Sequence, residues 1–170
     1  MIQRSWSGYI TSTACVRWVT RLPSVPLMFV ALLLTYTAAI PVILVTLAMP
    51  ELSLAGPGLG NRGAGAMILL GCLIAPLLET AVFQWACIRL LNRFKCPTGI
   101  TIAISATLFA LAHTYSAVYV LMTFVVGLVL AATFVIEDQR GGRPFLVTMA
   151  VHMMRNAITT VYFLYFATPG

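Results

Sequence analysis

The chain has 170 residues, of which 61% are hydrophobic and 8% are charged, and its formal net charge is +6. Soluble globular domains contain about 25% charged residues, so this composition excludes an ordinary water-soluble domain and indicates an integral membrane protein. The ten basic residues are spread thinly between apolar segments. That spacing argues against a nucleic-acid-binding surface and favours orientation signals at the membrane boundary.

The first 22 residues mix arginines with aromatic residues such as Trp6, Tyr9 and Trp18. Basic and aromatic side chains together are typical of a segment at the level of the lipid headgroups. We therefore expect residues 1–22 to form an interfacial arm, or simply the basic flank of the first span. Residues 23–170 are expected to form the membrane core.

The core is expected to be all-α, a polytopic transmembrane helical bundle of about five spans. Each expected span is an apolar run bounded by proline, glycine or charged residues, and a bilayer crossing needs ~20 such residues. Pro41 and Pro76 are expected to bend the first and second spans. The third span is short for a complete crossing, and a polar turn is expected after the fourth. The expected spans are 26–49, 64–91, 98–113, 118–136 and 145–166.

The basic residues also predict an orientation. With five spans, eight of them fall on the side of the N-terminus, only Arg62 falls on the other side, and Arg155 lies within the fifth span. Cytoplasmic segments of membrane proteins carry the excess of Lys and Arg. We therefore expect a multi-pass membrane protein with a cytoplasmic N-terminus.

Several polar residues interrupt the apolar spans. Glu79 is the only acid between Gly63 and Ile88, and a charge at the bilayer centre costs roughly 2.5–3.5 kcal/mol. Four further polar groups lie in other spans. Any one of them could simply form an interhelical hydrogen bond worth about 0.6 kcal/mol, but their coincidence favours a shared site. The full set is Glu79, His113, His152, Arg155 and Asn156.

These residue types suggest hydrolysis. A carboxylate and a neutral imidazole acting on one water molecule can remove its proton and pass it to a leaving group. A second histidine with an asparagine four residues later can donate hydrogen bonds to the oxyanion that forms at a carbonyl. The combination predicts hydrolysis of a peptide bond within the membrane.

Three short motifs resemble those of the CPBP intramembrane proteases, which include the type 2 CAAX prenyl endopeptidases. The family's first motif, usually Glu-Glu-x-x-x-Arg after Ala-Pro, corresponds to residues 75–84. The second, Phe-x-x-x-His, is Phe109 to His113, and the third, His-x-x-x-Asn, is His152 to Asn156. The resemblance covers about residues 70–160 and identifies the core as similar to a CPBP protease core.

The resemblance implies a glutamic-type endopeptidase. Glu79 and His113 would activate the water, and His152 and Asn156 would stabilise the oxyanion. No metal cofactor is implied, although two histidines and a glutamate could bind zinc in principle. The implied substrate is a membrane-anchored protein or peptide with a lipidated tail, a leader or a C-terminal sorting tag. The small size favours a bacterial inner-membrane enzyme, and nothing indicates the oligomeric state.

Two positions depart from the family pattern. Thr80 stands where the second Glu is usual, and Gln84 stands where the Arg is usual. Because these residues are four apart, we expect them to hydrogen-bond across one helical face. Arg155 is expected to replace the missing arginine as a partner of Glu79 or to receive a substrate carboxylate. The alternative is that it snorkels or lines a wet cavity.

The same departures leave a second function open, a non-catalytic immunity or scaffold protein that binds a membrane peptide. A proton or ion conduit has little support because no second acid continues a path. One difficulty concerns depth. Counted from the inner ends of their expected spans, Glu79 and His113 lie several residues deeper than His152.

Overall fold

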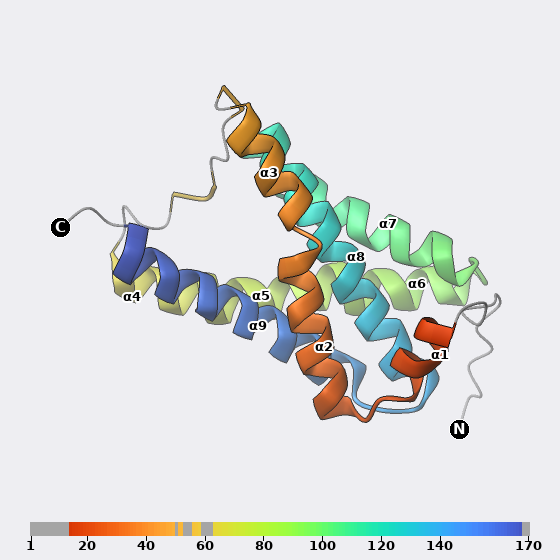
Figure 1. Ribbon diagram of the computed structural model, residues 1–170. Coiled ribbons are helices and arrows are strands. Elements are labelled where there is room, and N and C mark those ends of the chain that lie inside the picture. Colours follow the sequence, from red (N-terminus) through yellow and green to blue (C-terminus); the bar gives the residue numbers. More distant parts are fainter. Residues whose placement is uncertain (1–13, 50, 53–55, 59–62, 168–170) are drawn as a thin grey trace.

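The computed structural model describes residues 14–49, 51–52, 56–58 and 63–167, and its regular elements over these ranges are all helices (Figure 1). This confirms the all-α prediction. In the segments labelled η the helix is π-wound, with hydrogen bonds from residue i to residue i−5. The elements are α1 (Ala14–Arg21), α2 (Ser24–Thr37), α3 (Ile40–Ala48), α4 (Ala64–Ala66), η2 (Met67–Ile74), α5 (Ala75–Glu79), η3 (Thr80–Ala86), α6 (Cys87–Arg93), α7 (Thr98–Leu111), α8 (Ala117–Gln139), α9 (Pro144–Tyr162) and η4 (Phe163–Ala167).

Within the described residues, three helical stretches are long and apolar enough to cross a membrane: residues 24–48, 64–93 and 117–139. The stretch 64–93 runs without interruption from α4 to α6 and is called the long helix below. Helix α7 is apolar but has only 14 residues, or about 21 Å at 1.5 Å per residue, less than the ~30 Å hydrocarbon core. The last expected span forms α9 and η4, which are not among the three stretches.

In two of these stretches a proline lies where the helical geometry changes, at Pro41 and Pro76, the positions at which the sequence predicts bends. Helix α2 ends at Thr37 and α3 begins at Ile40, so that Pro41 lies in the first turn of α3. Pro76 lies in the first turn of α5, and π-helical segments precede and follow that short helix. A proline ring has no N–H to donate and fixes its own φ angle, so each one removes a backbone hydrogen bond from the helix.

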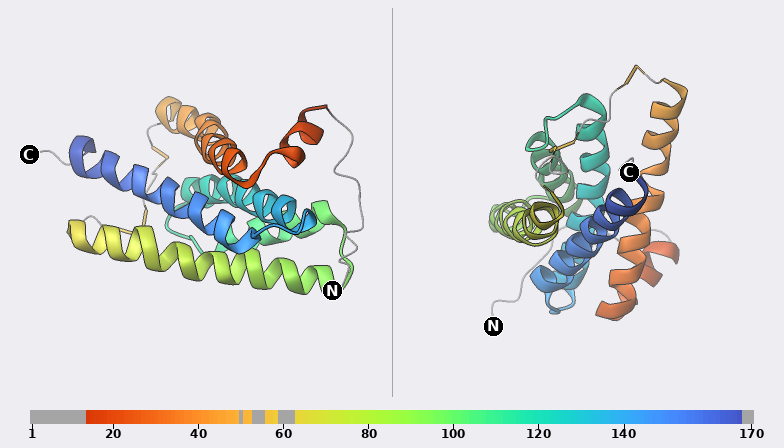
Figure 2. Two further views of the ribbon diagram at one scale, coloured as in Figure 1. Left: turned by 90° about the horizontal axis from the view of Figure 1, so that it is seen from below. Right: turned by 90° about the vertical axis from the view of Figure 1, so that its left-hand side faces the viewer.

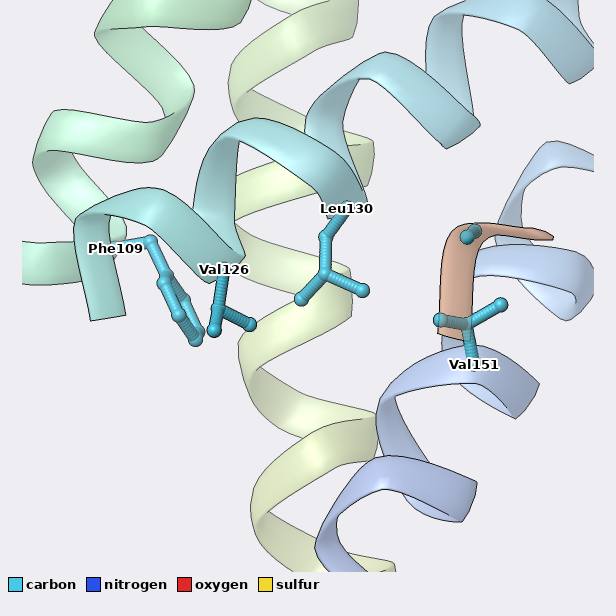
Figure 3. Close-up of a cluster of buried hydrophobic side chains, with 5 residues drawn as sticks. Phe109, Val126, Leu130 and Val151 are labelled. Atoms are coloured by element: carbon cyan, nitrogen blue, oxygen red, sulfur yellow. The ribbon is translucent and has the colours of Figure 1, made fainter. Parts of the chain in front are cut away.

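Helix α8 lies at the centre of the bundle and packs against α7, α9 and α2. The main core cluster joins these four helices and contains Ala31, Phe109, Val126, Leu130 and Val151 (Figure 3). Gly127 permits the close approach of α7 and α8. A Cβ atom at this position would lie 3.0 Å from the Phe109 ring and 3.1 Å from the Ala106 Cα.

The far end of α8 differs from the expectation. The expected fourth span ended at residue 136 with a polar turn from 137, but α8 continues to Gln139, and its last acids, Glu137 and Asp138, are buried. Asp138 pairs with Arg89 at 2.7 Å. Glu137 pairs with Arg140, which also donates to the backbone carbonyl of Leu22. Ion pairing therefore allows the helix to continue and fastens it to its neighbours.

The expected interfacial arm falls mostly outside the described residues, since only its last part, α1, is described. Large apolar side chains are exposed over the helices, including Leu33, Leu44, Leu69, Leu78 and Val82. Exposed apolar area of this extent marks a surface that another apolar phase covers, and this agrees with a membrane bundle. Three cysteines, Cys72, Cys87 and Cys96, are free thiols.

Candidate active site

Three of the sequence-predicted site residues meet around one carboxylate group. The His113 Nε2 atom lies 3.5 Å from Oε1 of Glu79, and the His152 Nε2 atom lies 3.5 Å from Oε2. The exposed fractions of the side chains are 23% for Glu79, 12% for His113 and 4% for His152. The carboxylate is thus flanked by two largely buried imidazoles, and it retains some accessible surface.

The register between the long helix and α9 brings His152 to this level. The two helices run antiparallel, with Thr80 opposite His152 and Cys72 hydrogen-bonded to Thr160. The same register sets Pro144 beside Ile88, so that α9 begins about 7.5 Å short of the end of α6. In Figure 2 the start of α9 lies short of the green end of the long helix. The difference in depth that the sequence suggested, with Glu79 and His113 lying deeper than His152, is therefore absent from the structure.

His113 lies just beyond α7 and not within a helix, which corrects the expected end of the third span. The helix ends at Leu111, and the His113 backbone N–H donates to the carbonyl of Ala110 at 2.9 Å. Its Nδ1 atom lies 2.6 Å from the carbonyl oxygen of Phe109. Because a carbonyl only accepts, Nδ1 carries the proton, and in the neutral ring Nε2 presents its lone pair towards Glu79.

Phe109 supports both imidazoles. Its ring centroid lies 4.6 Å from that of His113 and 5.6 Å from that of His152. Phe83 contacts the same ring edge-on at 5.8 Å. The phenylalanine of the second motif therefore holds the two histidines apart on either side of the carboxylate.

Thr80 occupies the place of the family's second glutamate, and its hydroxyl lies 3.4 Å from Nδ1 of His152. The expected hydrogen bond between Thr80 and Gln84 is wrong. Gln84 is fully buried, and within the described structure neither of its amide atoms has a hydrogen-bond partner. Thr80 instead faces α9, where it can orient the His152 ring.

Asn156 does not join the three residues at the carboxylate directly. Its Nδ2 atom donates to the carbonyl of Gly71 at 2.8 Å. That carbonyl is available because the π-helical pattern would pair it with the nitrogen of Pro76, which has no N–H. The bond uses one amide hydrogen of Asn156 and leaves the second one free.

Arg155 makes no ion pair with Glu79 in the described structure, whose carboxylate is flanked by the histidines alone. Its guanidinium lies over the ring of Tyr36 at 5.8 Å. The Tyr36 hydroxyl donates to the backbone carbonyl of Arg155 at 2.8 Å. The expectation that Arg155 replaces the missing motif arginine beside Glu79 is therefore not met by this geometry.

The sequence identified Phe109 but not the tyrosines around the site. Tyr119 and Tyr115 lie with their ring centroids 6.1 and 6.4 Å from that of His113. Their position just after the second motif is the only signal that could have pointed to them. Tyr36 comes from α2, far away in the chain, and no pattern in the sequence links it to the site.

Among the residues that the structure describes, no group of three His, Cys, Asp or Glu side chains is arranged to hold a metal ion. The expectation of a metal-free site stays a prediction.

Comparison with known proteins adds one finding. Residues 61–158, more than half of the chain, match the family model described as Rce1-like, type II CAAX prenyl endopeptidase Rce1-like. Comparisons with curated proteins and with solved structures gave no match. The matched region contains all three motifs.

Proposed function

Because the chain belongs to the Rce1-like family of type II CAAX prenyl endopeptidases, we propose that it is an intramembrane endopeptidase of the glutamic type. The family is a protease family, and with three helices able to span a bilayer the chain is an integral membrane protein. One observation carries the proposal. Three residues from three separate motifs converge, with both Nε2 atoms 3.5 Å from the oxygens of one carboxylate.

In the proposed reaction, Glu79 and His113 bind a water molecule beside the scissile carbonyl. The carboxylate accepts a proton from the water while the water oxygen bonds to the carbonyl carbon. His113 accepts a hydrogen bond at Nε2, the atom that its bond to Phe109 leaves free. The proton then passes to the amine as the C–N bond breaks, so that hydrolysis consumes one water.

The oxyanion formed on the carbonyl oxygen needs hydrogen-bond donors. We assign this role to His152 and to the second amide hydrogen of Asn156. Two features support the assignment: Thr80 can hold the His152 ring through Nδ1, and Gly71 holds the Asn156 amide at 2.8 Å. Donors fixed in advance around a developing charge contribute typically 10²–10³ in kcat each.

The proposed substrate is a membrane-anchored protein or peptide whose cleavage site lies near its lipid anchor. The family name points to a prenylated C-terminal box, in which the lipid is attached to a cysteine three residues from the end. We propose that the enzyme is a multi-pass protein of a bacterial inner membrane with a cytoplasmic N-terminus.

The test uses the full chain purified in lipid nanodiscs with a farnesylated peptide that ends in Cys-Val-Ile-Met. We expect cleavage by the wild type and its loss in Glu79→Gln and His113→Ala variants that remain folded. Glu51→Gln is the matched control because it removes an exposed acid outside the site. Cleavage that survives both site changes would falsify the assignment.

A separate experiment with a chelator tests whether a metal ion takes part in the reaction. If no zinc takes part, activity survives treatment with 1,10-phenanthroline and elemental analysis finds no stoichiometric zinc. Loss of activity that added zinc restores would replace the proposed water activation with a zinc-dependent one.

One observation favours a second function. The substitution of both motif partners by Thr80 and Gln84 removes an acid and a base, as expected for a non-catalytic protein that only binds a membrane peptide. That alternative predicts unchanged peptide binding in Glu79→Gln and no cleavage by the wild type.

A further inference from the structure

Arg155 is a cation near the middle of its helix. It follows the start of α9 at Pro144 by roughly 16 Å and precedes the end of η4 at Ala167 by roughly 18 Å, at 1.5 Å per residue. The sequence predicts that α9 and η4 cross the bilayer, and lipid phosphates would then lie beyond both ends of this helix. They are therefore poorly placed to neutralise this charge.

No acid of the chain pairs with Arg155 in the described structure. The sequence contains four acids, and all of them are described. Glu79 faces the two histidines, Glu137 pairs with Arg140, and Asp138 pairs with Arg89. The fourth, Glu51, is exposed in the turn after α3.

The guanidinium also retains hydrogen-bonding capacity. Its Nε atom is buried and has no hydrogen-bond partner among the described residues. The ring of Tyr36 lies 5.8 Å from the guanidinium carbon, and an aromatic face attracts a cation placed over it. Such a contact positions the guanidinium but satisfies none of its N–H groups, which suit a carboxylate held in two parallel hydrogen bonds.

The position of Arg155 links it to the reaction. It follows His152 by three residues, so these two side chains lie one turn apart on nearly the same face of α9, while the adjacent Asn156 turns towards the long helix. His152 and Arg155 are about 4.5 Å apart along the helix axis, and the guanidinium extends further. A substrate segment of two or three extended residues, at about 3.3 Å each, is long enough to reach from His152 to the guanidinium.

We propose that Arg155 binds the C-terminal carboxylate of the substrate, two or three residues beyond the scissile bond. This inference rests on the proposed function and makes it more specific. Arg155 would then be the residue that gives the enzyme its preference for a substrate with a free carboxylate close to the scissile bond.

The test compares two farnesylated peptides that differ only at the C-terminus, one with a free carboxylate and one with a carboxamide. For the wild type we expect kcat/KM to favour the carboxylate at least tenfold, mainly through KM. In Arg155→Gln the ratio should fall to near one. In Arg155→Lys, which keeps the charge but not the two-bond geometry, it should be intermediate. Arg143→Gln is the matched control, because it removes an exposed arginine at the start of the same helix.

Two outcomes would overturn the inference. One is a wild type that does not discriminate between the peptides. The other is an Arg155→Gln variant that loses activity equally on both, because this would mean that the arginine only positions the histidines or lines a wet cavity. If Arg155→Gln does not fold, the ratio in Arg155→Lys decides, and an unchanged ratio there contradicts the proposal.

A binding measurement separates this inference from the proposed function. Fluorescence anisotropy with non-cleavable versions of both peptides, in which the scissile amide is reduced, reports recognition without catalysis. If the wild type cleaves nothing yet binds the carboxylate form at least tenfold more tightly, the proposed function fails and the role of Arg155 stands. Equal binding of both forms would reject the role of Arg155 whether or not cleavage occurs.

Discussion

Thr80 and His152 face each other between the long helix and α9, with the threonine hydroxyl 3.4 Å from the Nδ1 atom of the imidazole. Both side chains are buried. A hydroxyl in this position can fix the ring so that Nε2 points at Glu79. The threonine at the family's second glutamate position thus has a structural role.

Thr80→Val should lower kcat up to about tenfold with little change in KM. The reason is that valine keeps the shape of threonine but loses a hydrogen bond worth about 0.5–1.5 kcal/mol. Peptide cleavage kinetics would measure the effect. Thr107→Val is the control, because this exposed threonine bonds only to Ala103 in its own helix. Thr80→Ser should retain activity, and an unchanged kcat in Thr80→Val would refute the orienting role.

Asn156→Ala should lower kcat by about 10²–10³, the usual effect of removing one oxyanion donor. Pro76→Ala should have a smaller effect in the same direction, because alanine supplies an N–H that competes for the Gly71 carbonyl and releases the asparagine. Single-turnover cleavage would separate this loss from slow product release. Asn92→Ala on α6 is the control, and equal losses in it and in Asn156→Ala would point to general destabilisation.

Gly127→Ala should destabilise the fold by about 1–3 kcal/mol, the range for overpacking a dense core. The added methyl group would lie 3.0 Å from the Phe109 ring, which packs against both site histidines. Gly99→Ala is the matched control, since nothing lies within 4 Å of its new Cβ atom and alanine is the better helix former. Denaturant titration in detergent micelles measures the free energy of unfolding of both variants. Equal stability of the two variants would contradict the close approach of α7 and α8.

Arg89→Gln should cost about 3 kcal/mol of stability, because it leaves the carboxylate of Asp138 without its 2.7 Å partner when only 2% of that side chain is exposed. The double variant Arg89→Gln/Asp138→Asn should recover much of the loss, since no uncompensated charge then stays buried. Arg93→Gln removes an exposed charge one turn later as a control. A double variant no more stable than Arg89→Gln would show that burial of the charge is not the cause.

The polar residues of the site were predictable because charge is rare in apolar sequence. Glu79, His113, His152 and Asn156 stand out against their neighbours, and the structure brings the first three together. The partner of Thr80 was not predictable from spacing alone. Four-residue spacing puts two side chains on one face, but a neighbouring helix decides which of them finds a partner, and here His152 takes Thr80.

The sequence by itself determined an all-helical membrane protein through its composition, the helix break near Pro41 through proline geometry, and the candidate site residues through rare polar groups and three short motifs. These properties are local, because hydrophobicity, proline geometry and the cost of a buried charge act wherever the chain lies. The tertiary structure alone decided the register of α9 on the long helix, the position of His113 beyond α7, and the contact of Tyr36 with Arg155. These depend on how distant helices pack, and sequence spacing within one helix carries no information about that.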